Sequence, residues 1–187
     1  MTRRFFRLLA CQLLLVFACA QAQAAEGVEI TRAHIESSDE GYKLAAAYAF
    51  DLNEELENAI QHGVKLYFTT QVELTRPRWY WYDDKAVSER QTMRIWYDVL
   101  TRQYQVSVVG NMLQSFATLE DAMVLIRRPS RWLIAPRGAL KAGETYNVTV
   151  RMYMDRERLA KPIQLNAFSN AQWRLESKDK KFLYRVE

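Results

Sequence analysis

Cysteine, histidine, glycine and proline are all scarce in this sequence. Its 187 residues include two cysteines, two histidines, six glycines and four prolines. His34 and His62 stand outside any metal-ligand spacing such as H-E-x-x-H, and the glycines form neither a P-loop nor a G-x-G-x-x-G motif. A G-x-S-x-G nucleophile motif is absent too. We therefore predict a protein that is not an enzyme of a recognised class, with no metal site and no cofactor.

The first 24 residues have the layout of a secretory signal peptide. Three arginines precede an apolar run over residues 8–20 that only Gln12 interrupts, and small residues follow it. This run of about 13 residues is shorter than the roughly 20 that a membrane-spanning helix needs. We expect cleavage after Ala24 and a periplasmic location; an uncleaved anchor is the alternative. A second alternative is lipid anchoring at Cys19, because residues 16–19 loosely resemble a lipobox.

Removal of the signal changes both the redox chemistry and the charge of the chain. Cys11 and Cys19 lie inside the signal, so residues 25–187 contain no cysteine and form no disulfide. Three of the 26 basic residues also lie there, which leaves 23 basic against 22 acidic residues. This near-neutral balance gives no electrostatic reason to expect a nucleic-acid partner. We expect residues 25–187 to form one domain, since no linker, repeat or low-complexity segment divides them.

Alternation of apolar and polar residues is the dominant pattern in the rest of the chain. It is strongest over residues 64–74 and 146–154, where it predicts strands with one buried face. Weaker runs of the same kind, including a tail with one or two strands, are found at 28–36, 42–51, 92–100, 104–109, 131–135, 163–168 and 172–185.

Two segments have helical spacing instead. Asn53 is a predicted N-cap for a helix that ends near Gly63, and Thr118 is a predicted N-cap for a helix that ends before Pro129. About eight strands and two short helices favour a mainly β fold, an antiparallel β-sandwich that is Ig-like in style.

The densest unusual feature is an aromatic block that follows the strand predicted at 64–74. It contains five consecutive residues, namely Arg78, Trp79, Tyr80, Trp81 and Tyr82. In an extended chain both of its faces are aromatic. One interpretation is a recognition surface for a protein or a sugar ring. The other is a β-hairpin whose tryptophans fill the core, since aromatic residues are ordinary strand formers.

Two further sets of residues adjoin the aromatic block. Arg94, Trp96 and Asp98 alternate with apolar neighbours and are predicted to extend an exposed stripe into the next strand. Asp83, Asp84 and Glu89 are the carboxylates nearest the block. Adjacent acids in a strand point to opposite faces, so a solvated turn is the simpler interpretation of the first two.

Several short blocks of this sequence are distinctive in combination, namely FTTQVE at 68–73, RPRWYW at 76–81, LTRQY at 100–104, SFATLEDA at 115–122 and KPIQL at 161–165. Together these blocks resemble the DUF4390 family, a proteobacterial family of exported proteins. The resemblance implies a small exported protein with no assigned activity and no catalytic residues to carry over. It also implies genes often placed near a membrane sensor kinase and a ribosomal RNA methyltransferase, which points towards envelope signalling.

Taken together, these features lead us to expect a periplasmic binding or adaptor domain. Its partner would be an envelope or membrane protein, contacted through the aromatic block and Trp96. The alternative is a module that binds carbohydrate or peptidoglycan by aromatic stacking. A third hypothesis, an enzyme that uses Asp83 or Glu89 as an acid or base, is the least supported by the pattern.

Overall fold

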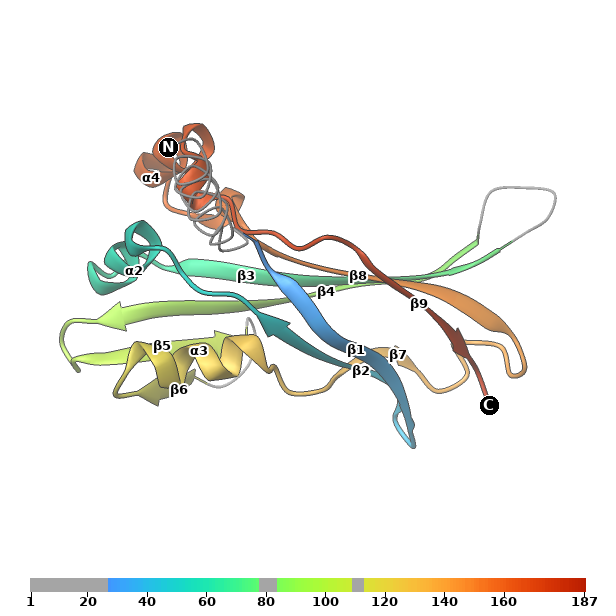
Figure 1. The fold of residues 1–187 in the computed structure, drawn as a ribbon. Helices are drawn as coiled ribbons and strands as arrows, with labels where there is room; N and C mark the ends of the chain where they lie inside the picture. Colours follow the sequence, from blue (N-terminus) through green and yellow to red (C-terminus); the bar gives the residue numbers. More distant parts are fainter. Residues whose placement is uncertain (1–26, 78–83, 109–112) are drawn as a thin grey trace, which may run out of the picture.

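The computed structural model describes residues 27–77, 84–108 and 113–187, which form two antiparallel β-sheets (Figure 1). The smaller sheet has three strands in the order β1 (Glu29–Ser38), β2 (Gly41–Ala49) and β7 (Trp132–Pro136). The larger sheet has six strands in the order β6 (Leu113–Phe116), β5 (Gln103–Val108), β4 (Asp84–Asp98), β3 (Leu66–Arg76), β8 (Thr145–Met154) and β9 (Lys180–Arg185). The predicted mainly β, sandwich-type fold is confirmed, with nine strands in the described part of the chain.

The smaller sheet packs against one face of the larger sheet, which we call the inner face. β1 contacts β8 and β9, while β7 contacts β4, so the central strand β2 lies over β3. Figure 1 shows β1, β2 and β7 together on one side of the six-stranded sheet. The other side of the larger sheet, its outer face, is turned away from them.

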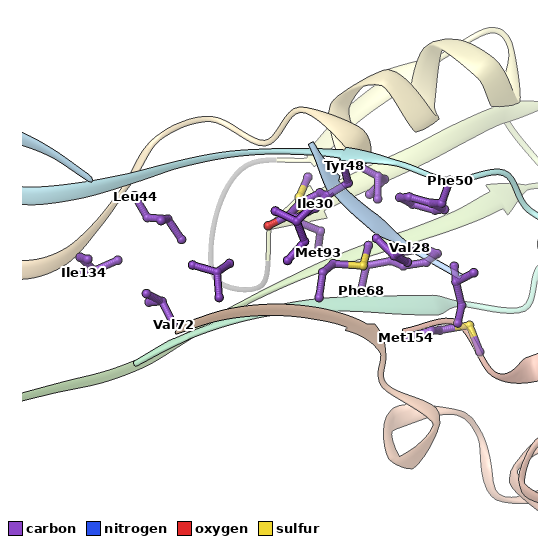
Figure 2. Close-up of a cluster of buried hydrophobic side chains, with 14 of the residues drawn as sticks. Val28, Ile30, Leu44, Tyr48, Phe50, Phe68, Val72, Met93, Ile134 and Met154 are labelled. Atoms are coloured by element: carbon purple, nitrogen blue, oxygen red, sulfur yellow. The ribbon is translucent and has the colours of Figure 1, made fainter. Parts of the chain in front are cut away.

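The alternation predicted at 64–74 and 146–154 directs every second side chain into the space between the sheets. Val72 of β3 pairs with Val150 of β8, and both are fully buried. Figure 2 shows Leu44 of the smaller sheet on the opposite side of the core from Val72. Each fully buried side chain of this size contributes about 1.5–3 kcal/mol, so the two apolar faces hold the layers together.

A hydrogen bond between two side chains crosses this apolar interface. The hydroxyl groups of Tyr48 on β2 and Thr70 on β3 lie 2.7 Å apart, and both residues are buried. Burial raises the pKa of the Tyr48 phenol to about 12, because a buried phenolate would lose its hydration. Tyr48 links the two sheets as a neutral phenol.

Two helices occur where the sequence predicts them, α2 (Glu54–Gln61) and α3 (Leu119–Arg127). The side-chain oxygens of Asn53 and Thr118 each accept a hydrogen bond from a backbone N–H of the first turn, at 3.0 and 3.1 Å. Both predicted N-caps are thus confirmed. α2 packs against β4, and α3 packs against β5 and β6.

The strand predicted at 163–168 is wrong, because this segment is the helix α4 (Lys161–Ser169). Pro162 in its first turn suits a helix start, where its missing N–H costs nothing. Ala167 is buried, whereas Leu165 and Phe168 are exposed. The alternation of apolar and polar residues in this segment therefore reflects a helix with apolar residues on two sides. Among the described residues, no helix is both long and apolar enough to cross a membrane.

Candidate functional site

The outer face of the six-stranded sheet is the candidate site, because polar, cationic and aromatic side chains gather there. On β3 and β8 these are alternate residues, with Thr69 beside Tyr153 and Gln71 beside Arg151. The Thr69 hydroxyl is buried and hydrogen-bonded to that of Thr92 on β4, at 2.9 Å. Figure 1 shows α4 standing on this side of the sheet, near one end of β3 and β8.

Trp96 is the one residue predicted for binding that the structure describes, and it lies on the outer face of β4. Its neighbour Ile95 is fully buried on the inner face, as the predicted alternation requires. The guanidinium carbon of Arg94 lies 4.6 Å from the centre of the indole ring, and the Lys65 ammonium lies 5.6 Å from it. Each is a cation–π contact. The indole is therefore only partly open and already contacts two cations of its own chain.

The other five residues predicted for binding cannot be placed on either face. Arg78, Trp79, Tyr80, Trp81 and Tyr82 lie outside the described residues, between the end of β3 and the start of β4. Whether the tryptophans of the aromatic block enter the core or form a recognition surface therefore stays open.

Arg94 stacks on the indole of Trp96 and is only partly hydrogen-bonded. Its Nη2 atom donates to the Ser107 hydroxyl at 3.3 Å. Within the described part of the chain, its buried Nε atom has no hydrogen-bond partner. A buried N–H without an acceptor costs about 1–3 kcal/mol, so this position carries a fixed positive charge at an energetic cost.

Farther along the outer face, next to α4, is a cavity of about 330 Å³ that we call the arginine pocket. Its lining includes four arginines and three carboxylates, namely Arg90, Arg151, Arg156, Arg174, Asp155, Glu157 and Glu176, together with Gln71, Tyr153 and Phe168. Arg90 comes from β4, Arg151 from β8, and Arg156 from the short 3-10 helix η1 (Arg156–Arg158). The pocket is thus assembled from segments that are far apart in the sequence.

Only some of the cations of the arginine pocket are neutralised by carboxylates. Glu176 accepts from Arg151 at 2.5 Å and forms an ion pair with Arg174 at 2.6 Å. Hydrogen bonding by Arg174 is the main cause of a lowered pKa of the Glu176 carboxyl, and Arg151 adds to it. By contrast, among the described residues neither Arg90 nor Arg156 forms an ion pair with a carboxylate. The Nη1 atom of Arg156 donates to a backbone carbonyl, that of residue 167, at 3.0 Å.

A carboxylate of α2 fixes the segment that forms one wall of the pocket. Glu55 accepts from the indole N–H of Trp173 at 2.5 Å and from the Asn170 amide at 2.9 and 3.0 Å. Trp173 belongs to η2 (Ala171–Trp173), a short 3-10 helix that follows α4. Trp173 is only 4% exposed, while Glu55 and Asn170 are half-buried. This network joins α2 to the C-terminal end of α4.

The carboxylates and histidines predicted from the sequence do not converge. Glu89 is exposed on β4, and Asp84 forms an ion pair with Arg76 of β3 at 3.1 Å. His34 contacts Glu36, and His62 contacts a backbone carbonyl of its own helix. Across residues 27–77, 84–108 and 113–187, no cluster of three or more histidine, cysteine or acidic side chains is placed to hold a metal ion. Asp83 lies outside the described residues.

Comparison with known proteins yields one match. A family model described as "Domain of unknown function (DUF4390)" matches residues 25–183. No curated protein and no solved structure matches the chain.

Proposed function

Since the chain belongs to the DUF4390 family of domains of unknown function, we propose a role for it from its own surface. It is an exported, non-enzymatic binding or adaptor domain that contacts an envelope or membrane protein through the outer face of its larger sheet. The observation that carries this proposal is the partly exposed Trp96, which is stacked with Arg94 at 4.6 Å on that face.

The chemistry of the outer face suits a protein partner. Tryptophan, tyrosine and arginine contribute most to protein–protein interfaces, because they combine a large contact area with few rotatable bonds or with directional hydrogen bonds. A second pair of this kind, Arg151 over the ring of Tyr153 at 5.6 Å, lies on β8 of the same face. The rigid sheet beneath them fixes their spacing, which lowers the entropy lost on binding.

The compartment is part of the proposal. The predicted signal at residues 1–24 supports export to the periplasm, where the partner would be a protein of the envelope. An accessory role in envelope signalling agrees with the gene neighbourhood that the family resemblance implies. The near-neutral charge of residues 25–187 gives no support to a nucleic-acid partner.

A glycan-binding module, the alternative predicted from the sequence, needs an aromatic face open to a sugar ring. The indole of Trp96 lies against Arg94 and near Lys65, so a sugar would have to displace a cation there. Such a module would depend on the tryptophans at 79 and 81. Sedimentation with purified peptidoglycan separates the two functions, because a protein-binding domain stays in the supernatant.

The proposal is tested by site-specific photo-crosslinking in cells. A photo-reactive amino acid replaces Lys65 or Thr149 on the outer face and, as controls, Arg32 of β1 or Arg137 beyond β7. We expect a discrete crosslinked product from the two outer-face positions and none from the controls. The same product from Arg32 would contradict the role of the outer face.

A substitution then links the product to the aromatic stack. A variant that combines Trp96→Ala with the photo-reactive group at position 149 should lower the yield of the product at least about fivefold, in line with the cost of truncating an interface hot spot. Trp132→Ala on β7 is the matched control for loss of a partly buried indole. Circular dichroism shows whether both variants are folded. An unchanged yield from a folded Trp96→Ala variant would refute the proposal.

A further inference from the structure

Next to the arginine pocket, α4 exposes two apolar side chains to solvent. Leu165 is 80% exposed and Phe168 is 52% exposed. They are three residues apart on a helix, so they lie on neighbouring positions of one side. Phe168 also lines the arginine pocket, and the guanidinium of Arg156 lies 5.2 Å from the centre of its ring. An exposed apolar pair and a cationic cavity therefore lie side by side at one edge of the outer face, the edge next to α4.

Basic residues are concentrated around this edge. Residues 151–178, which include η1, α4 and η2, contain six basic and three acidic residues. The remainder of residues 25–187 contains 17 basic and 19 acidic residues, so it has the opposite net sign. The net positive charge of residues 25–187 is therefore contributed by the segment that contains α4.

The carboxylates at this edge do not cancel the charge of the pocket. Asp155 is bound to Arg158 at 3.0 Å, and Glu176 is bound to Arg151 and Arg174. Glu157 is the remaining carboxylate on the pocket wall and is exposed. Arg90 and Arg156 are left to meet an external anion, and a guanidinium suits the oxygens of a phosphate in particular.

From this juxtaposition we propose that the arginine pocket binds the phosphate of an anionic phospholipid headgroup, while Leu165 and Phe168 enter the apolar layer below it. The domain would thereby lie on a lipid surface with α4 against the membrane. A soluble anion would account for the arginines but not for two exposed apolar side chains beside them. The basic side chains come mainly from neighbouring segments, since α4 itself contains only Lys161. Apolar side chains flanked by basic ones bind anionic lipid surfaces, and each Lys or Arg near such a surface strengthens the attachment. This inference does not depend on the protein partner proposed above.

Vesicle flotation tests the proposal with pure lipids. The protein is isolated after export and its N-terminus is determined by mass spectrometry, so that an uncleaved signal or a lipid on Cys19 is recognised. Vesicles contain either phosphatidylcholine alone or phosphatidylcholine with 30% phosphatidylglycerol. We expect flotation only with the anionic vesicles, and a steep loss of flotation when salt rises, because surface charges are screened.

Variants assign the binding to this edge. Leu165→Ser/Phe168→Ser and Arg90→Gln/Arg156→Gln should each lower the fraction bound to anionic vesicles about tenfold, as reversible attachment needs both an apolar and an electrostatic contribution. The matched controls are Leu183→Ser and Arg137→Gln, which should bind as the wild type does. Leu183 lies on β9 and is 71% exposed. Leu165→Ser alone, at the more exposed position, serves if the double variant fails to fold. Flotation that survives the serine substitutions in folded protein would overturn the proposal.

Soluble probes distinguish a lipid from a free anion. Inorganic phosphate and glycerol phosphate are titrated while the amide spectrum of the protein is followed by NMR. Weak binding of glycerol phosphate that Arg90→Gln/Arg156→Gln removes, together with flotation, supports the headgroup site. Binding of either soluble anion without flotation would overturn the lipid proposal in favour of a small anionic ligand. Absence of both would overturn the site itself.

Discussion

Removal of the Glu55 carboxylate should loosen the wall of the arginine pocket and destabilise the domain. In Glu55→Ala the buried indole N–H of Trp173 and the Asn170 amide both lose their acceptor. A hydrogen bond to a charged group contributes about 1.5–3 kcal/mol, and a buried donor left unsatisfied costs about 1–3 kcal/mol. Since Trp173 is buried and Asn170 is only partly so, we expect a loss of about 2–4 kcal/mol in the free energy of unfolding.

Urea unfolding followed by tryptophan fluorescence measures this loss, and Glu54→Ala is the control. Both residues lie in the first turn of α2, where a carboxylate favours the helix dipole by about 0.3–1 kcal/mol. Among the described residues, Glu54 is exposed and makes no side-chain hydrogen bond or ion pair. The difference between the two variants therefore isolates the network.

Hydrogen exchange locates the change within the molecule. Amides of α4 and η2 should exchange faster in Glu55→Ala, while those in the middle of β3 should follow only the global loss of stability. Glu55→Gln, which keeps an acceptor oxygen, should give an intermediate result. A loss below about 0.5 kcal/mol, within the range of ordinary surface substitutions, would refute the assignment of Glu55 as the anchor of this segment.

Three further predictions concern stability. Gly41→Ala should cost about 2–4 kcal/mol in urea unfolding, because φ is +141° and a Cβ atom would lie 2.2 Å from the carbonyl oxygen of Ala135. The pKa of Glu176 is lowered beside Arg174, so its carboxylate stabilises the fold at pH values above the ordinary carboxyl pKa of 4.5. This contribution is at most about 1 kcal/mol for a partly exposed pair. It should be lost as the pH falls below 4.5. Thr118→Ala should lower stability by about 1 kcal/mol through loss of the α3 N-cap.

Each of these predictions has a comparison that isolates its cause. Gly138 has a φ of +84°, but no atom lies within 4 Å of an added Cβ. Gly138→Ala should therefore lower the free energy of unfolding by about 1 kcal/mol, through backbone strain alone. Equal losses at the two glycines would contradict the steric argument. Glu176→Gln should flatten the acid side of the stability profile, and an identical profile would remove Glu176 from the explanation. Thr118→Ser keeps the capping oxygen and should restore the stability lost in Thr118→Ala.

The fold was predictable from the sequence where local pattern and tertiary burial agree. β3 and β8 each have one apolar face because a single layer covers them, so period-two alternation identifies both. Asn53 and Thr118 cap helices through contacts within four residues, which the sequence displays directly. The order of the strands depends on contacts between distant segments, such as β2 beside β7, and no local pattern reports it.

The segment at 163–168 misled the prediction for a physical reason. α4 has one buried small side chain, Ala167, while Leu165 and Phe168 face solvent. A helix of this kind has no single apolar stripe, so its pattern resembles that of a short strand. The exposed apolar residues that obscured the helix are those now proposed to contact lipid.

The candidate site was predictable only in part. Alternation placed Trp96 and Arg94 on one face of β4, and their stacking follows from their spacing. The arginine pocket has no sequence signature, because Arg90, Arg151 and Arg156 come together only through sheet pairing and the return of the chain over the outer face. Arginines are common on protein surfaces, so their number alone does not mark a site.

The hydrogen bond between Tyr48 and Thr70 has a consequence for how the two layers are aligned. Apolar contacts are non-directional, so two smooth apolar faces have little to prevent one from sliding over the other. A slip of two residues along β2 would move Tyr48 by about 6–7 Å and bring another apolar side chain to a similar place. It would also leave two buried hydroxyl groups without partners, at a cost of about 1–3 kcal/mol each. This polar contact therefore favours one offset between the sheets, and with it the position of the outer face relative to the smaller sheet.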